Sequence, residues 1–476
     1  MNQSVQEPSI ASHPDRLLPT ETGARNVARE LLADVENLPI ISPHGHVPAS
    51  LFVDDAAFPD PTALLITPDH YVTRLIHSSG IPLHDLGVGN PSVDSREAWR
   101  RFAKAWPLFE GTASGYWLRG EFEHIFDIPG SLIDLLPSGG GDAVYDALTT
   151  KLTDPEFRPR QLFTGFGLEV LATTDDPLDS LGDHATLAAD PTFSGRVLPT
   201  FRPDAYLNPS QHGWQERVSR LMDEAAEGLT GFAGYLRALE NRRAHFIEHG
   251  AVSADHGVRT PRTVRLEAQE AASLFSRAQS GLATAADQEL FEAHMLYEMA
   301  RMSVEDGLVM TLHPGSFRNH HTPSLERYGP DTGHDIPIAI NYTEGIRPIL
   351  QHFGDAEGFH LVLFTLDETV LSREIAPMAG FYPSVFIGAP WWFLDAPDAM
   401  LRFRSAITET AGFSRTSGFI DDTRAFCSIP ARHDASRRIE ASFLARLVTE
   451  HRISEERAHE LIVDIVDRAP RRVFKL

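Results

Sequence analysis

Lysine and cysteine are almost absent from this chain of 476 residues. Only Lys104, Lys151 and Lys475 occur, and none falls in a segment that we expect to form a core strand. This scarcity argues against Schiff-base catalysis and against a carboxylated lysine that bridges two metal ions. The single cysteine, Cys427, excludes an internal disulfide framework.

Long apolar runs and a recognisable targeting signal are also missing. No run of about 18 apolar residues occurs, so we expect no membrane span. The N-terminal stretch MNQSVQEPSIASHPDRLLP lacks the basic-then-apolar pattern of a secretory signal, and we therefore expect a cytoplasmic protein.

Positive charge is scarce as well, because 66 acidic residues outnumber 42 basic ones and the net charge is −24. Nucleic acids and anionic membranes need a basic surface, so the charge argues against both as partners. An anionic small substrate is still possible. Salt screens the field of the net charge beyond about 8 Å, so a few arginines can set the local charge of a binding pocket.

Short apolar runs that end in polar or turn residues alternate with helical patterns. Eight of them predict strands, at 38–44, 168–174, 196–201, 250–254, 307–313, 360–366, 384–388 and 417–421. This alternation favours a (β/α)8 TIM-type barrel. A doubly wound open sheet is the alternative that periodicity leaves open.

Two intervals between predicted strands are too long for simple crossovers. Residues 1–49 hold an N-terminal segment and the first strand, and 50–160 are predicted to form an inserted helical subdomain. The remainder of the barrel spans 161–476, with an elaborated helical connection at 258–305.

A His-Gly-His motif follows the first predicted strand. Residues two apart on an extended chain point the same way, so His44 and His46 could bind one cation. With 22 histidines in the chain, about one such pair is expected by chance, so the motif alone is weak. Its place at the carboxyl end of a strand favours a site, because barrel active sites gather there.

The eighth predicted strand ends in two carboxylates and an arginine. Asp422 and Arg424 can face one pocket if the extended conformation continues, whereas Asp421 would point the other way. A surface ion pair is the plain alternative. Barrel closure would bring Asp422 beside the two histidines, and two His plus one Asp leave coordination positions open.

Other polar residues follow the predicted strands. His313 could be a structural histidine, but Arg318 close after it favours a polar pocket wall. Arg202 could pair bidentately with a carboxylate. Trp391, Trp392 and Phe393 could form an apolar wall beneath a sugar ring, or could simply pack in the core. Asp255 after strand four could be catalytic or a turn residue.

Taken together, the segments resemble the uronate isomerase (glucuronate isomerase) family of the amidohydrolase superfamily. In chain order they are LPIISPHGHV, PDHYVTRLI, LATTDDPLDSL, VLPTFRPD, SADHG, LHPGSFRN, YGPDTGHDI, GAPWWF, GFIDDTRAFCS and RAPRRVF. Two of them depart from the usual family pattern, since Ser42 replaces an aspartate and Asp421 a threonine.

The resemblance implies an activity and a set of roles. Members of the family convert glucuronate to fructuronate and galacturonate to tagaturonate, as aldose–ketose isomerases of hexuronate catabolism. By motif, His44, His46 and Asp422 would bind one Zn²⁺, Tyr71 would take the C2 proton, and Arg424 would stabilise the cis-enediolate. Asp422 would also be catalytic, by moving protons during ring opening. The substrate-binding residues would be His70, Arg202, His313, Arg318 and Trp391. A homo-oligomer is expected.

The chemistry constrains these roles. A tyrosine is a weak base at its usual pKa of about 10, so a nearby positive charge must lower that pKa, and Arg424 or the metal is the expected source. The nearest alternative function is a mononuclear zinc-dependent hydrolase of the amidohydrolase type, in which Asp422 would activate a water molecule. A non-catalytic sugar-acid-binding protein is a further alternative.

Overall fold

Seven short parallel strands surround the centre of the computed structural model, which describes residues 9–476. One sheet consists of β1 (Ile40–Ser42), β2 (Leu168–Ala172) and β3 (Arg196–Leu198). The other consists of β4 (Ser253–His256), β5 (Val309–Leu312), β8 (Leu361–Leu363) and β9 (Val385–Ile387). Phe201 joins the two sheets, because it forms single bridges to Asp175 and to Ala254. The first eight residues of the N-terminal segment lie outside the described residues.

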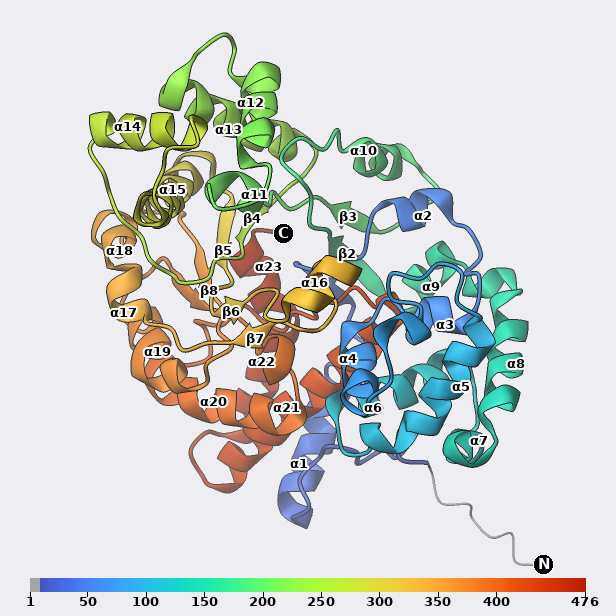
Figure 1. Cartoon of the computed structure of the whole chain (residues 1–476). Coiled ribbons are helices and arrows are strands. Elements are labelled where there is room, and N and C mark those ends of the chain that lie inside the picture. The colour runs from blue at the N-terminus through green and yellow to red at the C-terminus, as the bar shows by residue number, and fades with distance from the viewer. Residues whose placement is uncertain (1–8) are drawn as a thin grey trace, which may run out of the picture.

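The strands follow one another in chain order, without the reversal of order that defines a doubly wound sheet. Thr416 forms a bridge to Ile387 of β9 and so takes the eighth place. The His46 amide donates a hydrogen bond to the Thr423 carbonyl at 3.0 Å, which brings the eighth segment beside the first. The arrangement is that of a barrel with helices around it (Figure 1).

The predicted strand at 417–421 is wrong, because no regular strand forms there. Gly418 has a φ of 75° and Asp422 a φ of 42°, and both values lie outside the extended region. Two such residues interrupt a ladder. What remains is the Thr416 bridge, made by the bonds from the Ile387 amide to the Arg415 carbonyl and from the Ser417 amide to the Ile387 carbonyl. A Cβ at Gly418 would lie 2.5 Å from Pro470 Cδ, so only glycine fits.

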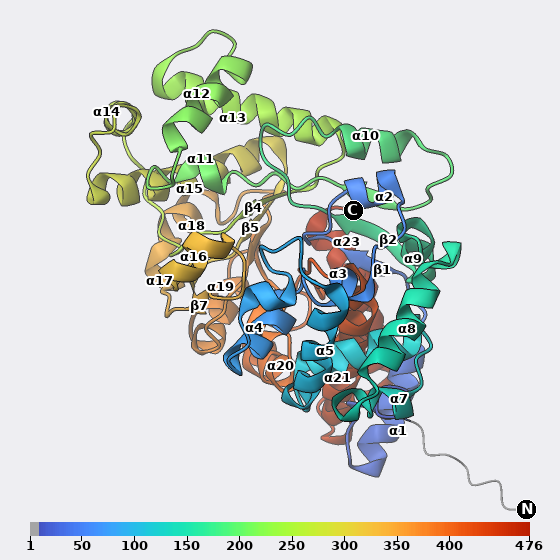
Figure 2. The same ribbon diagram turned by 45° about the vertical axis from the view of Figure 1, so that its right-hand side comes forward.

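A layer of helices is inserted between β1 and β2 (Figure 2). Its α-helices are α2 (Ser50–Asp54), α3 (Pro61–Leu65), α4 (His70–Ser78), α5 (Ser95–Ala105), α6 (Ala113–Gly120), α7 (Gly130–Ile133), α8 (Gly141–Leu152) and α9 (Pro159–Gly165). Helix α5 buries Trp99 and Phe102, three residues apart on one face. Their hydrophobic cluster extends to Ile40 of β1 and Leu168 of β2, so the layer shares a core with the barrel.

A second group of helices precedes β5 and lies away from the inserted layer (Figure 1 and Figure 2). It comprises α12 (Trp214–Ala225), α13 (Gly231–Glu248), α14 (Ala268–Gln279) and α15 (Ala285–Asp306). An arm follows β5, in which β6 (Ser316–Phe317) and β7 (Ile336–Pro337) pair antiparallel with α16 (Thr322–Tyr328) between them. This arm is defined here as residues 316–337.

The remaining helices complete the wall. They are α1 (Thr22–Ala33), α10 (Gly182–Ala189), α11 (Asp204–Leu207), α17 (Tyr342–Gly345), α18 (Arg347–Phe353), α19 (Ala376–Ala379), α20 (Pro397–Ala411), α21 (Ile429–Thr449), α22 (Glu455–Val463) and α23 (Ala469–Phe474). Val473 and Phe474 of α23 pack in one cluster with Val309, Val362 and Phe386 of the strands. No helix within residues 9–476 has the length and apolarity needed to cross a bilayer.

Gly418→Ala should destabilise the chain by roughly 2 kcal/mol or more, because it adds a steric clash to an unfavourable φ. Gly307→Ala is the matched control, since Gly307 has a φ of 82° with open space around it. That control should cost only about 1 kcal/mol. Denaturant unfolding would measure both, and equal losses would contradict the packing argument.

Candidate active site

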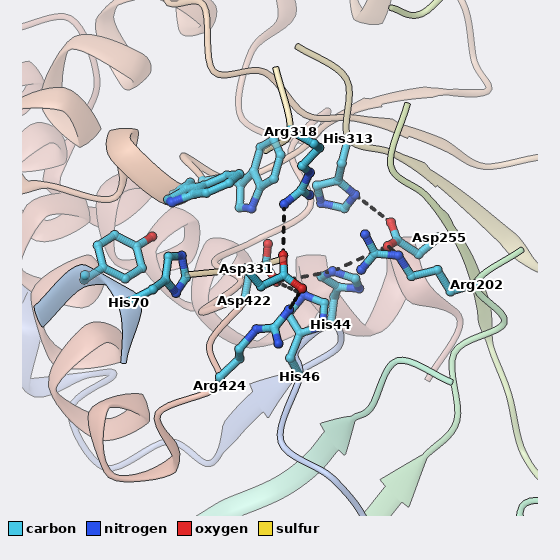
Figure 3. Close-up of a pocket in the computed structure, with 13 residues that line it drawn as sticks. His44, His46, His70, Arg202, Asp255, His313, Arg318, Asp331, Asp422 and Arg424 are labelled. Atoms are coloured by element: carbon cyan, nitrogen blue, oxygen red, sulfur yellow. Dashed lines mark hydrogen bonds and ion pairs between the residues drawn. The ribbon is translucent and has the colours of Figure 1, made fainter. Parts of the chain in front are cut away.

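Thirteen residues line one pocket, shown in Figure 3. All ten residues that were assigned a metal-binding, catalytic or substrate-binding role are among them, namely His44, His46, His70, Tyr71, Arg202, His313, Arg318, Trp391, Asp422 and Arg424. Asp255, Asp331 and Trp392 complete the lining. Most of these residues follow the carboxyl ends of the strands, whereas α4 supplies His70 and Tyr71 and the arm supplies Arg318 and Asp331.

Two histidines and one aspartate converge near the centre of the pocket (Figure 3). The Asp422 Oδ1 atom lies 2.9 Å from His46 Nε2 and 3.4 Å from His44 Nε2. Ligand atoms around a tetrahedral zinc ion lie about 3.3 Å apart, given bonds of about 2.0–2.2 Å. These three side chains can therefore hold a single divalent cation.

The pKa values of the three groups in this triad are shifted in different directions. Burial raises the pKa of Asp422, but His44 and His46 outweigh burial and hold that pKa well below its usual value. Burial lowers the pKa of His46 by more than Asp422 raises it. At His44 burial also lowers the pKa, but Asp255 and Asp422 outweigh it, and the pKa of His44 is raised.

The backbone reaches this geometry differently from the expected way. Asp422 and Arg424 both line the pocket, but the positive φ of Asp422 shows that the extended conformation does not continue. Asp421 lies outside the lining, as expected, and its Oδ2 is 3.1 Å from His433 Nε2 on α21.

Asp255 and His313 form a second cluster against His44. His313 Nδ1 is 2.6 Å from Asp255 Oδ1, while His44 Nε2 and Arg202 Nε are 4.0 and 3.6 Å from Asp255 Oδ2. Burial raises the pKa of Asp255, yet His313, His44 and Arg202 together hold it well below its usual value. The negative charge of Asp255 is thus already balanced by its neighbours. His313 Nε2 has no hydrogen-bond partner within residues 9–476.

Helix α4 places two titratable groups in the pocket. Its N-cap is Asp69, whose side chain accepts a hydrogen bond from the Tyr71 amide at 2.8 Å. Burial, followed by Arg424, lowers the pKa of His70 to about 3, so His70 is a neutral imidazole. Burial raises the pKa of Tyr71 well above 10, with Asp395 acting in the same direction and Arg432 against it.

Arg424 or the metal stays the predicted source of positive charge that would lower the pKa of Tyr71. Arg424 Nη2 forms an ion pair with Asp331 Oδ2 at 2.9 Å. The arginine that opposes the burial of Tyr71 is Arg432.

Asp331 is a pocket residue that the sequence did not reveal. It lies between two arginines (Figure 3), because its Oδ1 is 3.5 Å from Arg318 Nη1 in addition to the Arg424 pair. A second bond, from Arg318 Nη1 to Asp335 Oδ2 at 2.9 Å, anchors Arg318 within the arm. Asp331 lies in YGPDTGHDI, where no spacing distinguishes a pocket residue from a turn aspartate.

The aromatic side of the pocket consists of two tryptophans. Trp391 meets the His313 ring edge-to-face, with centroids 4.8 Å apart. Trp392 lies beneath the Arg318 guanidinium, whose central carbon is 5.0 Å from the ring centroid. Trp391 and Trp392 of the predicted wall therefore both line the pocket, whereas Phe393 does not.

Asp331→Asn should raise the affinity of the pocket for an anionic sugar acid, because the carboxylate competes for Arg318 and Arg424. We expect a gain of about threefold to tenfold, since half-exposed ion pairs contribute only about 1 kcal/mol. Calorimetry with D-gluconate would measure the gain, and D-sorbitol, its uncharged counterpart, should show none. A weaker affinity for gluconate would contradict this assignment.

Comparisons with known proteins agree with this geometry. A family model described as glucuronate isomerase matches residues 21–474. The uronate isomerase of Corynebacterium efficiens is 57% identical, with 98% of this chain and 99% of that protein covered. The uronate isomerase of Cutibacterium acnes is 48% identical, with coverages of 99% and 100%.

Solved structures agree as well. The glucuronate isomerase of Caulobacter crescentus superposes with a TM-score of 0.93 at 44% identity, with 97% of this chain and 96% of that one covered. The uronate isomerase of Thermotoga maritima gives a TM-score of 0.90 at 28% identity, with coverages of 97% and 99%. The expected amidohydrolase-like (β/α)8 fold is thereby confirmed. The chain belongs to the glucuronate isomerase family, whose members are isomerases of the aldose–ketose type.

Proposed function

We propose that this chain interconverts D-glucuronate and D-fructuronate, D-galacturonate and D-tagaturonate, or both pairs, in hexuronate catabolism. The observation that carries the proposal is that one pocket combines a cation-binding triad, a tyrosine and three arginines. An aldose–ketose isomerisation needs these groups, since it moves a proton from C2 to C1 beside a developing oxyanion.

His44, His46 and Asp422 would hold the cation, and a set of two imidazoles and one carboxylate suits Zn²⁺. When bound, the ion would supply positive charge that orients and polarises oxygen atoms of the substrate. The near-absence of lysine and the engagement of Asp255 by His313 and Arg202 favour one ion over two.

Tyr71 would carry the proton. Its ionised oxygen takes the proton from C2, and the electron pair of the broken C–H bond forms the C1=C2 double bond while the C1 oxygen becomes anionic. Arg424 stabilises this cis-enediolate after leaving Asp331. A proton then passes from the C2 oxygen to the C1 oxygen, and Tyr71 returns its proton to C1 as the C2 carbonyl forms.

The remaining residues of the pocket would bind the substrate. Arg202 and Arg318 would pair with its carboxylate, and His313 Nε2, which lacks a partner within residues 9–476, would bond to an oxygen of the sugar. Neutral His70 would hydrogen bond without adding charge. Trp391 would cover the carbon skeleton.

A coupled assay tests this function directly. The metal-loaded chain should form ketose from glucuronate, galacturonate or both, and should exchange hydrogen at C2 with solvent. Tyr71→Phe should nearly abolish that exchange while leaving bound zinc unchanged, because Tyr71 is not a metal ligand. Absence of turnover of both acids would overturn the proposal, and persistent exchange in Tyr71→Phe would remove Tyr71 from its role.

A further inference from the structure

The proposed role of Tyr71 leaves its charge unexplained. A phenol that accepts a proton must first be ionised, and burial opposes ionisation of Tyr71. Arg424, which with the metal is an expected source of positive charge, is paired with Asp331. A further cation against the Tyr71 ring would also favour the ionised phenol.

Arg432 of α21 lies against that ring. Its side chain is only 1% exposed, and its guanidinium carbon is 5.0 Å from the Tyr71 ring centroid and 3.6 Å from that of Trp117. Tyr71 and Trp117 meet edge-to-face at 5.5 Å. The guanidinium therefore contacts both rings, and a planar cation held against aromatic rings is an arrangement that arginine suits and lysine does not.

Hydrogen bonds hold all but one nitrogen of this guanidinium. Nε donates to Ser428 Oγ at 3.0 Å, and Nη1 donates to Asp395 Oδ2 at 2.5 Å and to the Asp421 carbonyl at 3.4 Å. Nη2 is buried and has no partner within residues 9–476. A buried donor without a partner is costly, so its retention calls for an explanation.

The surroundings keep Arg432 charged. Burial lowers its pKa, but Asp395, Tyr71, Asp69 and Asp421 outweigh burial and raise the pKa above its ordinary value. Glu121 adds a further carboxyl nearby, and its own pKa is raised well above the usual value by burial and Asp69 despite Arg432. Within residues 9–476, Asp395 is the one carboxylate close enough for an ion pair with Arg432.

We propose that Arg432 is a positioning residue for Tyr71, which holds the ring in place and directs the unpartnered Nη2 toward the Tyr71 oxygen in its ionised state. This inference rests on the proposed function, because it concerns the same proton transfer. Arg432 does not line the pocket, so it acts through Tyr71 and not through the substrate. Asp395 holds the guanidinium by accepting a hydrogen bond from Nη1.

Arg432→Met should lower kcat for D-glucuronate by about 100-fold, the usual size of an acid–base contribution. The KM for D-glucuronate and the affinity for D-gluconate should stay within about threefold of those of the unsubstituted chain, because the residues that bind the substrate are untouched. Arg432→Lys keeps the charge and should retain kcat to within about tenfold.

The loss of one buried charge can unfold a protein, so a second variant is needed. Arg432→Met combined with Asp395→Asn removes both members of the ion pair and should show the same loss of kcat. Arg404→Lys is the matched control, since Arg404 is equally buried and binds Glu440 at 2.7 Å away from the pocket. It should reduce the unfolding temperature without lowering kcat.

The inference is overturned if either Met variant keeps the parental kcat, if the loss falls on KM and gluconate affinity, or if Arg432→Lys is no better than Arg432→Met. These outcomes differ from failure of the proposed function. If the proposed function were wrong, the unsubstituted, metal-loaded chain would itself produce no ketose.

Discussion

The site depends on the meeting of two segments that lie far apart in the chain. His44 and His46 follow β1, while Asp422 follows the eighth position of the barrel, and the bond from the His46 amide to the Thr423 carbonyl joins them. The positive φ of Asp422 turns the chain where the ladder would have continued. Without this closure the three cation-binding side chains would not meet. The other pocket residues would then not surround a single binding site.

Other parts of the chain add to that centre in layers. The inserted helices supply Tyr71 and His70, the arm supplies Arg318 and Asp331, and α21 supplies Arg432 behind the Tyr71 ring. Arg318, Arg424 and Arg432 each form an ion pair with a carboxylate. An arriving uronate would therefore exchange existing ion pairs and would not enter a field of unpaired cations.

Much of this could be predicted from the sequence, because apolar runs followed by polar residues mark the ends of barrel strands. Seven of the eight strands were located in this way, and the motifs brought all ten proposed residues to one pocket. The eighth strand failed because Gly418 and Asp422 leave the extended region, which an apolar run does not reveal. Asp331 was missed because it lies in an irregular loop. Arg432 was missed because a helix rich in arginine is usually exposed to solvent, whereas Arg432 is buried.

We expect a single cation between His44, His46 and Asp422. The neighbouring set of His44, Asp255 and His313 is the competing position, and it shares one ligand with the first. Anomalous diffraction from zinc-loaded crystals containing D-gluconate distinguishes the two positions directly. We expect one peak, bound by both histidines of the His-Gly-His motif and by Asp422. A peak bound by Asp255 and His313, or two peaks of equal height, would contradict it.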